Sequence, residues 1–213
     1  MGCYAVAEYR LWPGGAEPFR ATARGVSEAL GLTPGRGALR VAIGDQDDTH
    51  ALWVVRWDDP DGQAAAHARL PAELRARLAV SIAAGMNAPW RWYAPIRTIE
   101  RAFVPAAFCS VVRLRVAPED GGRLVESWLD PVLERVAAQP ELASSVALRA
   151  VDDPGAFMAL QEWRRPIGPE LSRELLRVTP PPVPLLAWDR SVGWIGQTRD
   201  RYAVVERMAL VGA

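Results

Sequence analysis

Residues 57–62, Trp-Asp-Asp-Pro-Asp-Gly, recur as residues 163–168, Trp-Arg-Arg-Pro-Ile-Gly, 106 positions further along the chain. Two more short matches occur in the same order at a spacing of 106 or 105: Glu100-Arg101 with Glu206-Arg207, and Arg10 to Pro13 with Arg115 to Pro118. The spacing is about half of the 213 residues, so two diverged copies of one domain of about 100 residues explain it. We predict two domains, residues 1–104 and 105–213.

Both halves show the same order of local patterns. Strand-like runs are expected at 3–12, 38–43, 50–57 and 91–102, and again at 107–117, 143–150, 156–163 and 200–210. Helical spacing of apolar residues, from Phe19 to Leu30 and from Leu124 to Val132, predicts a helix after the first strand of each half. A second helix is expected after Trp57 and after Trp163.

This order, βαββαβ twice, is typical of a ferredoxin-like unit, in which both helices cover one face of an antiparallel sheet. Two such units in one chain can cover their bare faces by pairing sheet to sheet. We therefore predict an α+β protein whose two ferredoxin-like repeats form an intrachain pseudo-dimeric α+β barrel. The alternative is two units that lie side by side, each with a separate partner.

Composition excludes several classes of function. There are 25 basic and 25 acidic residues, so no net charge favours binding to nucleic acid. Every basic residue is an arginine, which excludes lysine Schiff-base chemistry and a P-loop lysine. No apolar run reaches 18 residues, and the first ten residues do not form a signal peptide. We expect a cytoplasmic protein that binds neither nucleic acid nor membranes.

Only two cysteines, Cys3 and Cys109, and two histidines, His50 and His67, are present. These numbers are too small for a disulfide scaffold, a thiolate metal site or a three-histidine metal site within one chain. We therefore predict no metal site.

The stretch from Ala51 to His67, ALWVVRWDDPDGQAAAH, resembles the strand-to-helix signature of the antibiotic biosynthesis monooxygenases. In that family a strand ends near Glu-Trp, and the following helix carries Ala-x-x-His. Phe157 to Trp163, FMALQEW, is similar to the strand part of the signature in the second half. The resemblance covers essentially the whole chain, as a tandem fusion of two family domains. It implies an oxygenase without a bound cofactor that acts on an aromatic polyketide, with molecular oxygen as co-substrate.

Two departures from the family pattern bear on where catalysis would occur. Arg56 stands where the family usually has Glu, whereas the second half keeps Glu162. The second half has no histidine, so only the first half is expected to be catalytic, with the second as a structural partner. The resemblance also implies that a haem-degrading relative needs an asparagine on the first strand, and the one asparagine of this chain is Asn87.

His67 is the candidate general base, because its reference pKa lies near neutrality and it stands on the helix that matches the family. The alternative is a packed histidine of the core. Tyr93 and Arg97 alternate onto one face of a strand and are predicted to hold a phenolate or quinone oxygen. A structural polar ladder explains that pair equally well.

Nine tryptophans in one chain supply wide apolar walls, each with one N–H donor. The predicted substrate-binding residues are Trp53, Trp57, Trp90, Trp92, Asn87 and Tyr9. Packing in the core is the alternative for any single tryptophan.

The resulting prediction is a cofactor-independent monooxygenase that oxidises an anthrone-like or hydroquinone-like intermediate of natural-product biosynthesis. A polyketide cyclase on the same fold, and a non-catalytic binding protein for haem or a hydrophobic metabolite, are the alternatives. The expected partner is a small aromatic substrate, and the chain is expected to be a monomer with an internal pseudo-dimer or a homodimer.

Overall fold

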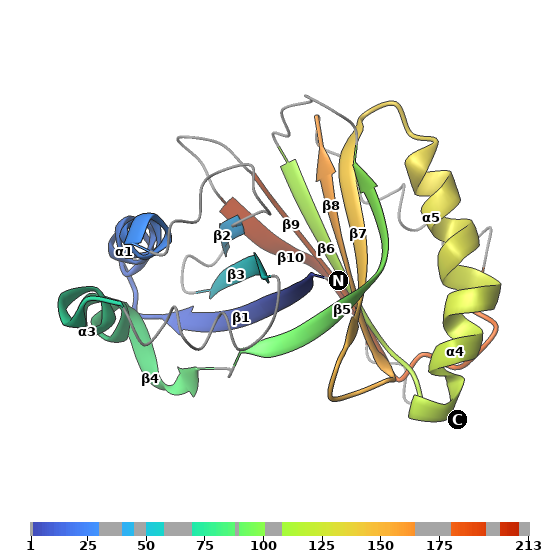
Figure 1. The fold of residues 1–213 in the computed structure, drawn as a ribbon, viewed down its shortest axis with the longest axis horizontal. Coiled ribbons are helices and arrows are strands. Elements are labelled where there is room, and N and C mark those ends of the chain that lie inside the picture. The colour runs from blue at the N-terminus through green and yellow to red at the C-terminus, as the bar shows by residue number, and fades with distance from the viewer. Residues whose placement is uncertain are drawn as a thin grey trace. The chain divides into compact units, whose positions relative to one another are not determined.

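The chain divides into two compact units, whose elements are labelled in Figure 1. The first unit comprises Met1–Ala94 with Asp200–Ala203, and the second comprises Pro95–Arg199 with Val204–Ala213. The computed structural model describes residues 2–29, 40–44, 50–57, 70–87, 90–100, 108–164, 180–194 and 201–208.

The first unit combines an antiparallel sheet with helices. Its elements are β1 (Cys3–Leu11), α1 (Ala16–Ala29), β2 (Arg40–Gly44), β3 (His50–Trp57), α3 (Ala72–Ser81), β4 (Ile82–Asn87) and the first part of β5 (Arg91–Glu100). β3 lies between β2 and β1, and β1 also pairs with β4 and with β5. The start of β10 (Arg201–Met208) pairs in parallel with β2. Helices α1 and α3 lie side by side (Figure 1).

A tight turn carries the chain from β1 into α1. The Gly15 N–H donates to the Trp12 carbonyl at 2.8 Å, and Gly14 between them has a φ of 77°. Pro13 followed by a residue with positive φ is the pattern of a type II turn, which favours glycine at the second central position. The chain reverses there, and the buried ring of Phe19 in α1 packs against β1 residues.

The second unit also sets an antiparallel sheet against helical segments. Its elements are the later part of β5, β6 (Phe108–Arg115), η1 (Pro118–Asp120), α4 (Gly121–Leu124), η2 (Val125–Leu129), α5 (Asp130–Ala137), β7 (Leu142–Ala150), β8 (Ala156–Trp163), β9 (Ala187–Trp194) and the later part of β10. Four of its strands run in the order β9–β6–β8–β7. β6 and β8 are therefore adjacent, as β1 and β3 are in the first unit. The stretch before β9 packs Val183 into the core.

One helical segment of the second unit contains a π turn. It runs through α4, η2 and α5, and η2 is the π turn, in which the Asp130 N–H donates to the Val125 carbonyl. Pro131 comes directly after this turn, and it has no N–H to give to a carbonyl of the preceding turn. A proline ring in a regular helix clashes with a carbonyl of the preceding turn, and the wider π turn relieves this clash. The buried Trp128 lies in this widened turn.

A close backbone approach fixes the turn between β7 and β8. A methyl group on Gly155 would lie 2.3 Å from the carbonyl oxygen of Val116, so no larger side chain fits there without a shift. The Gly155 N–H donates to the carboxylate of Asp153, at 3.1 Å. Asp153 also forms a 3.1 Å ion pair with Arg115, which holds the turn against the end of β6.

The predicted α+β class is confirmed, and most predicted strands are present within two or three residues of their expected ends. Two strands were not predicted. β9 pairs with β6 in the place where residues 200–210 were expected, and β4 begins at Ile82, where the helical pattern was expected to continue. The helix expected directly after Trp57 lies outside the described residues.

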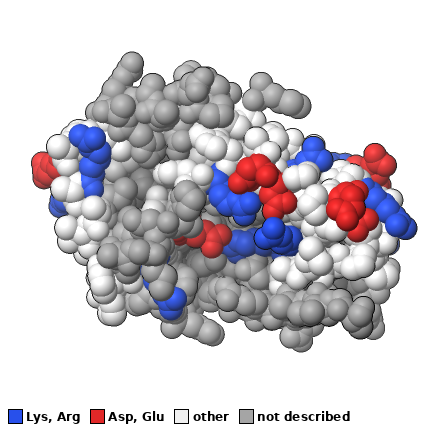
Figure 2. Space-filling model, turned by 90° about the horizontal axis from the view of Figure 1, so that it is seen from below, with Lys and Arg blue, Asp and Glu red and all other residues white. Residues whose placement is uncertain are grey.

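Charged side chains of both signs are interspersed on the face seen in Figure 2. Within the described ranges, the longest helices are too short and too polar to cross a membrane.

Candidate functional site

The residues predicted to bind substrate all take positions on one face of the first unit's sheet. They are Tyr9, Trp53, Trp57, Asn87, Trp90 and Trp92. Residues paired directly across neighbouring strands share a face, and five of the six follow from the pairs Cys3 with Trp57, Ala5 with Trp92, Ala7 with Trp53 and Tyr9 with Asn87. Trp90 stands two residues before Trp92 and packs against the same core cluster. Trp53 and Asn87 are placed by backbone register alone.

This face is the one that the helices cover. Tyr9 and Phe19 of α1 belong to one buried core cluster, and Leu74 of α3, Trp57 and Trp90 pack against it. The rings of Tyr9 and Phe19 are 5.4 Å apart and tilted by 54°. The face is therefore both aromatic and enclosed between sheet and helices.

Tyr9 is buried to 7% exposure, and this burial raises the pKa of its phenol above the ordinary value. The hydroxyl is therefore neutral throughout the physiological range. Tyr9 adds a polar group to this face without adding a charge.

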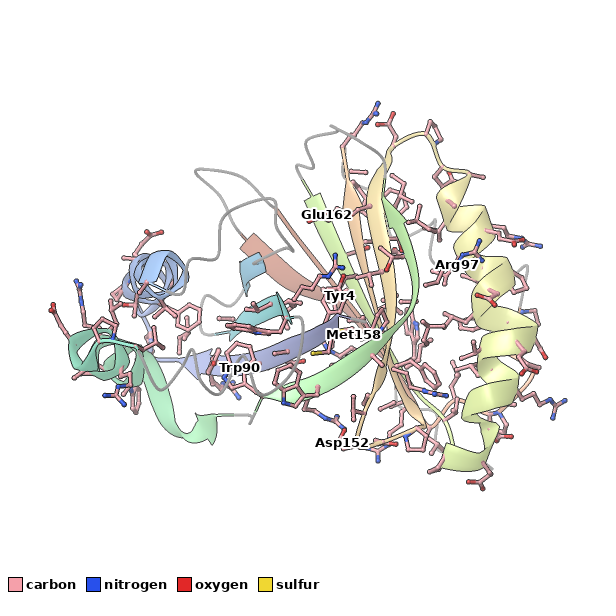
Figure 3. All side chains as sticks on the ribbon, viewed as in Figure 1. Tyr4, Trp90, Arg97, Asp152, Met158 and Glu162 are labelled. Carbon is pink, nitrogen blue, oxygen red and sulfur yellow. The ribbon has the colours of Figure 1, made fainter. Side chains whose placement is uncertain are left out.

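Trp57 carries an unpaired donor on the same face. Its indole Nε1 is buried and has no hydrogen-bond partner among the described residues. Buried polar atoms are nearly always paired in folded proteins, so the Trp57 indole N–H is an exception among the described residues. Trp90 packs against the same core (Figure 3).

The two residues predicted to hold a substrate oxygen, Tyr93 and Arg97, belong to different units. Tyr93 is buried and pairs with Tyr4, which puts it on the opposite face of the sheet from the tryptophans. Arg97 belongs to the second unit and points toward α5, where it forms ion pairs of 3.6 Å with Asp130 and 3.7 Å with Glu134 (Figure 3). His67, the predicted base, lies outside the described residues.

The second unit contains a pocket between its sheet and its long helix. The helix supplies the lining residues Trp128, Leu129, Val132, Leu133 and Val136. The sheet supplies Val112 and Leu114 from β6, Ala159 and Gln161 from β8, and Trp188 from β9. The interior measures about 50 Å³, and about 530 Å³ of empty space is present when the solvent at its mouth is counted.

Few polar atoms interrupt this apolar lining. Trp188 is 3% exposed, and its indole Nε1 finds no acceptor among the described residues. The Oε1 of Gln161 accepts a 3.1 Å hydrogen bond from the Ser110 hydroxyl, and the indole N–H of Trp163 donates to the same hydroxyl, also at 3.1 Å. Ser145, paired across the sheet with Gln161, has a buried hydroxyl without a partner among the described residues.

Sequence reasoning did not identify this pocket. Gln161 belongs to the FMALQEW stretch, and Trp128 and Trp188 carry no motif. The available signals were the helical spacing of Leu124, Trp128 and Val132, and the alternation of Trp188 with Val192 and Trp194.

No protein-family model matches the sequence, and a search of curated proteins finds no match. Solved structures with a similar fold align with almost the whole chain. A putative monooxygenase from Fusobacterium nucleatum aligns with a TM-score of 0.70 and 10% identity, covering 100% of this chain and 96% of that one. A putative monooxygenase from Lactobacillus acidophilus aligns with a TM-score of 0.61 and 8% identity, covering 98% and 99%.

An anthrone oxidase-like protein also aligns, with a TM-score of 0.56 and 12% identity, covering 99% of this chain and 94% of that one. At such low identity the likeness is one of fold. It confirms, at that level, the resemblance that the sequence motifs indicated. Over almost its whole length, the chain therefore has the α+β fold of proteins named as monooxygenases.

Proposed function

We propose that this chain is a cofactor-independent monooxygenase that oxidises an electron-rich aromatic compound of the anthrone or hydroquinone type. The observation that carries the proposal is the helix-covered face of the first unit, where the unpaired Trp57 indole N–H lies beside further aromatic residues. The fold of an anthrone oxidase-like protein gives independent support.

The reaction needs little from the protein. An anthrone loses a proton to give an electron-rich anion, and that anion passes one electron to dioxygen. The two radicals combine to a peroxide, which loses water and leaves the quinone. The protein has to accept the first proton, hold the ring system flat and keep it away from water.

Each proposed role falls on a residue of the first unit. Trp57, Trp90 and Trp92 hold the rings, and the Trp57 N–H donates to the substrate oxygen, where negative charge develops in the anion. His67 accepts the proton. We assign no oxygen-binding role to Tyr93 or Arg97, because the first faces away from the tryptophans and the second is paired with two carboxylates.

We further propose that the two units pair through the sheet faces that carry no helices. In support, the middle of that face carries apolar residues in each sheet, with Val6 and Val54 in the first unit and Val111 and Leu148 in the second. A chain that pairs with itself in this way has the mass of one copy in solution, which light scattering coupled to size exclusion measures.

The deciding experiment uses metal-stripped protein with anthrone, under air and under nitrogen, while oxygen uptake and quinone absorbance are followed. Quinone formation that needs oxygen and protein, with no added flavin, metal or haem, is the expected result. A ring-closed product formed equally well under nitrogen from a polyketide chain would instead indicate a cyclase. Tight binding without turnover would indicate a carrier protein.

Two variants connect the activity to the site. Trp57→Phe keeps a ring but removes the donor, and losing one donor to a developing oxyanion lowers the rate about 100-fold or more. Trp12→Phe is the control, because Trp12 is exposed. His67→Ala is expected to lower the rate by about 100-fold at neutral pH and less at high pH, where the substrate ionises by itself. Equal rates for Trp57→Phe and Trp12→Phe would refute the site.

A further inference from the structure

We draw no further inference here: the strongest candidate, the apolar pocket between the sheet and the long helix of the second unit, carries none, because nothing among the described residues shows what would occupy it.

Discussion

Trp163 and Ser110 form a hydrogen bond across the β6–β8 pair, with 3.1 Å between the indole nitrogen and the hydroxyl oxygen. Trp57 ends β3 of the first unit as Trp163 ends β8, and its indole has no such partner among the described residues. The register places Ala5 beside Trp57 where the second unit has Ser110 beside Trp163. One difference between the units therefore pairs an indole in the second and leaves the corresponding indole without a partner among the described residues in the first.

Replacing Ser110 by alanine should destabilise the chain by about 1–3 kcal/mol. The change leaves the buried N–H of Trp163 without an acceptor and removes the hydroxyl that donates to Gln161. Urea unfolding followed by circular dichroism measures the loss. Ser127→Ala is the matched control, because Ser127 is exposed on the helix, and it should change the free energy of unfolding by less than about 0.5 kcal/mol. Equal effects of the two substitutions would contradict the buried network.

Gly155→Ala should also destabilise, by about 1–3 kcal/mol, because its methyl group would meet the Val116 carbonyl oxygen at 2.3 Å. Gly122→Ala is the matched comparison for Gly155→Ala. Gly122 is an exposed helical residue with no atom within 4 Å of an added methyl group, so alanine should stabilise the helix by about 0.5–1 kcal/mol. Thermal unfolding of both variants should therefore shift in opposite directions, and a shift in the same direction would argue against this account of the turn.

Arg97→Gln should lower the free energy of unfolding by about 0.2–1 kcal/mol, because it removes two partly exposed ion pairs to α5. The loss should shrink in 1 M NaCl, where such pairs are screened. Arg149→Gln, at an exposed arginine of β7, serves as the control. A loss that is independent of salt would mean that Arg97 contributes through packing of its aliphatic part.

Tyr9 should make stability fall at high pH. Its phenol keeps its proton in the folded chain because burial raises the pKa, whereas in the unfolded chain it ionises near pH 10. The unfolded state then binds fewer protons, so the contribution of Tyr9 is fully present below pH 10 and decreases above it, by about 1.4 kcal/mol per pH unit.

Comparison with Tyr9→Phe isolates this effect. The difference in free energy of unfolding between wild type and variant should be constant from pH 6 to 9 and should fall by about 1 kcal/mol on going to pH 11. A difference that stays flat to pH 11 would show that the phenol is not buried in the folded state.

The sequence predicted those parts of the fold whose residues carry their own pattern. β3 and β8 are rich in apolar residues and end in the repeated Trp57 and Trp163, so their extent could be predicted. β9 was missed because Asp189, Arg190 and Gly193 interrupt its apolar pattern and its partner β6 is far away in sequence. Tertiary pairing stabilises such a strand, and local propensity does not report it.

The candidate sites, too, could be predicted only where a local sequence pattern marks their residues. The shared face of Trp57, Trp90 and Trp92 could be anticipated in part from alternation along two strands. The pocket around Trp128 and Trp188 joins two residues 60 positions apart through a helix and a strand, and no motif connects them. The ion pairs of Arg97 could not be predicted either, because Asp130 and Glu134 lie on a helix that is distant in sequence and comes near Arg97 only in the fold.

The π turn at Val125–Leu129 also bears on the predicted duplication. From Cys3 to Phe108 the corresponding positions differ by 105, but from Trp57 to Trp163 they differ by 106. Two copies of one ancestor would thus differ by a net of one residue between these strands, and a π turn is where a helix takes up one residue without losing its course. Trp128 lies in that turn and lines the pocket, so the one-residue difference between the halves would fall at the wall of the second unit's pocket.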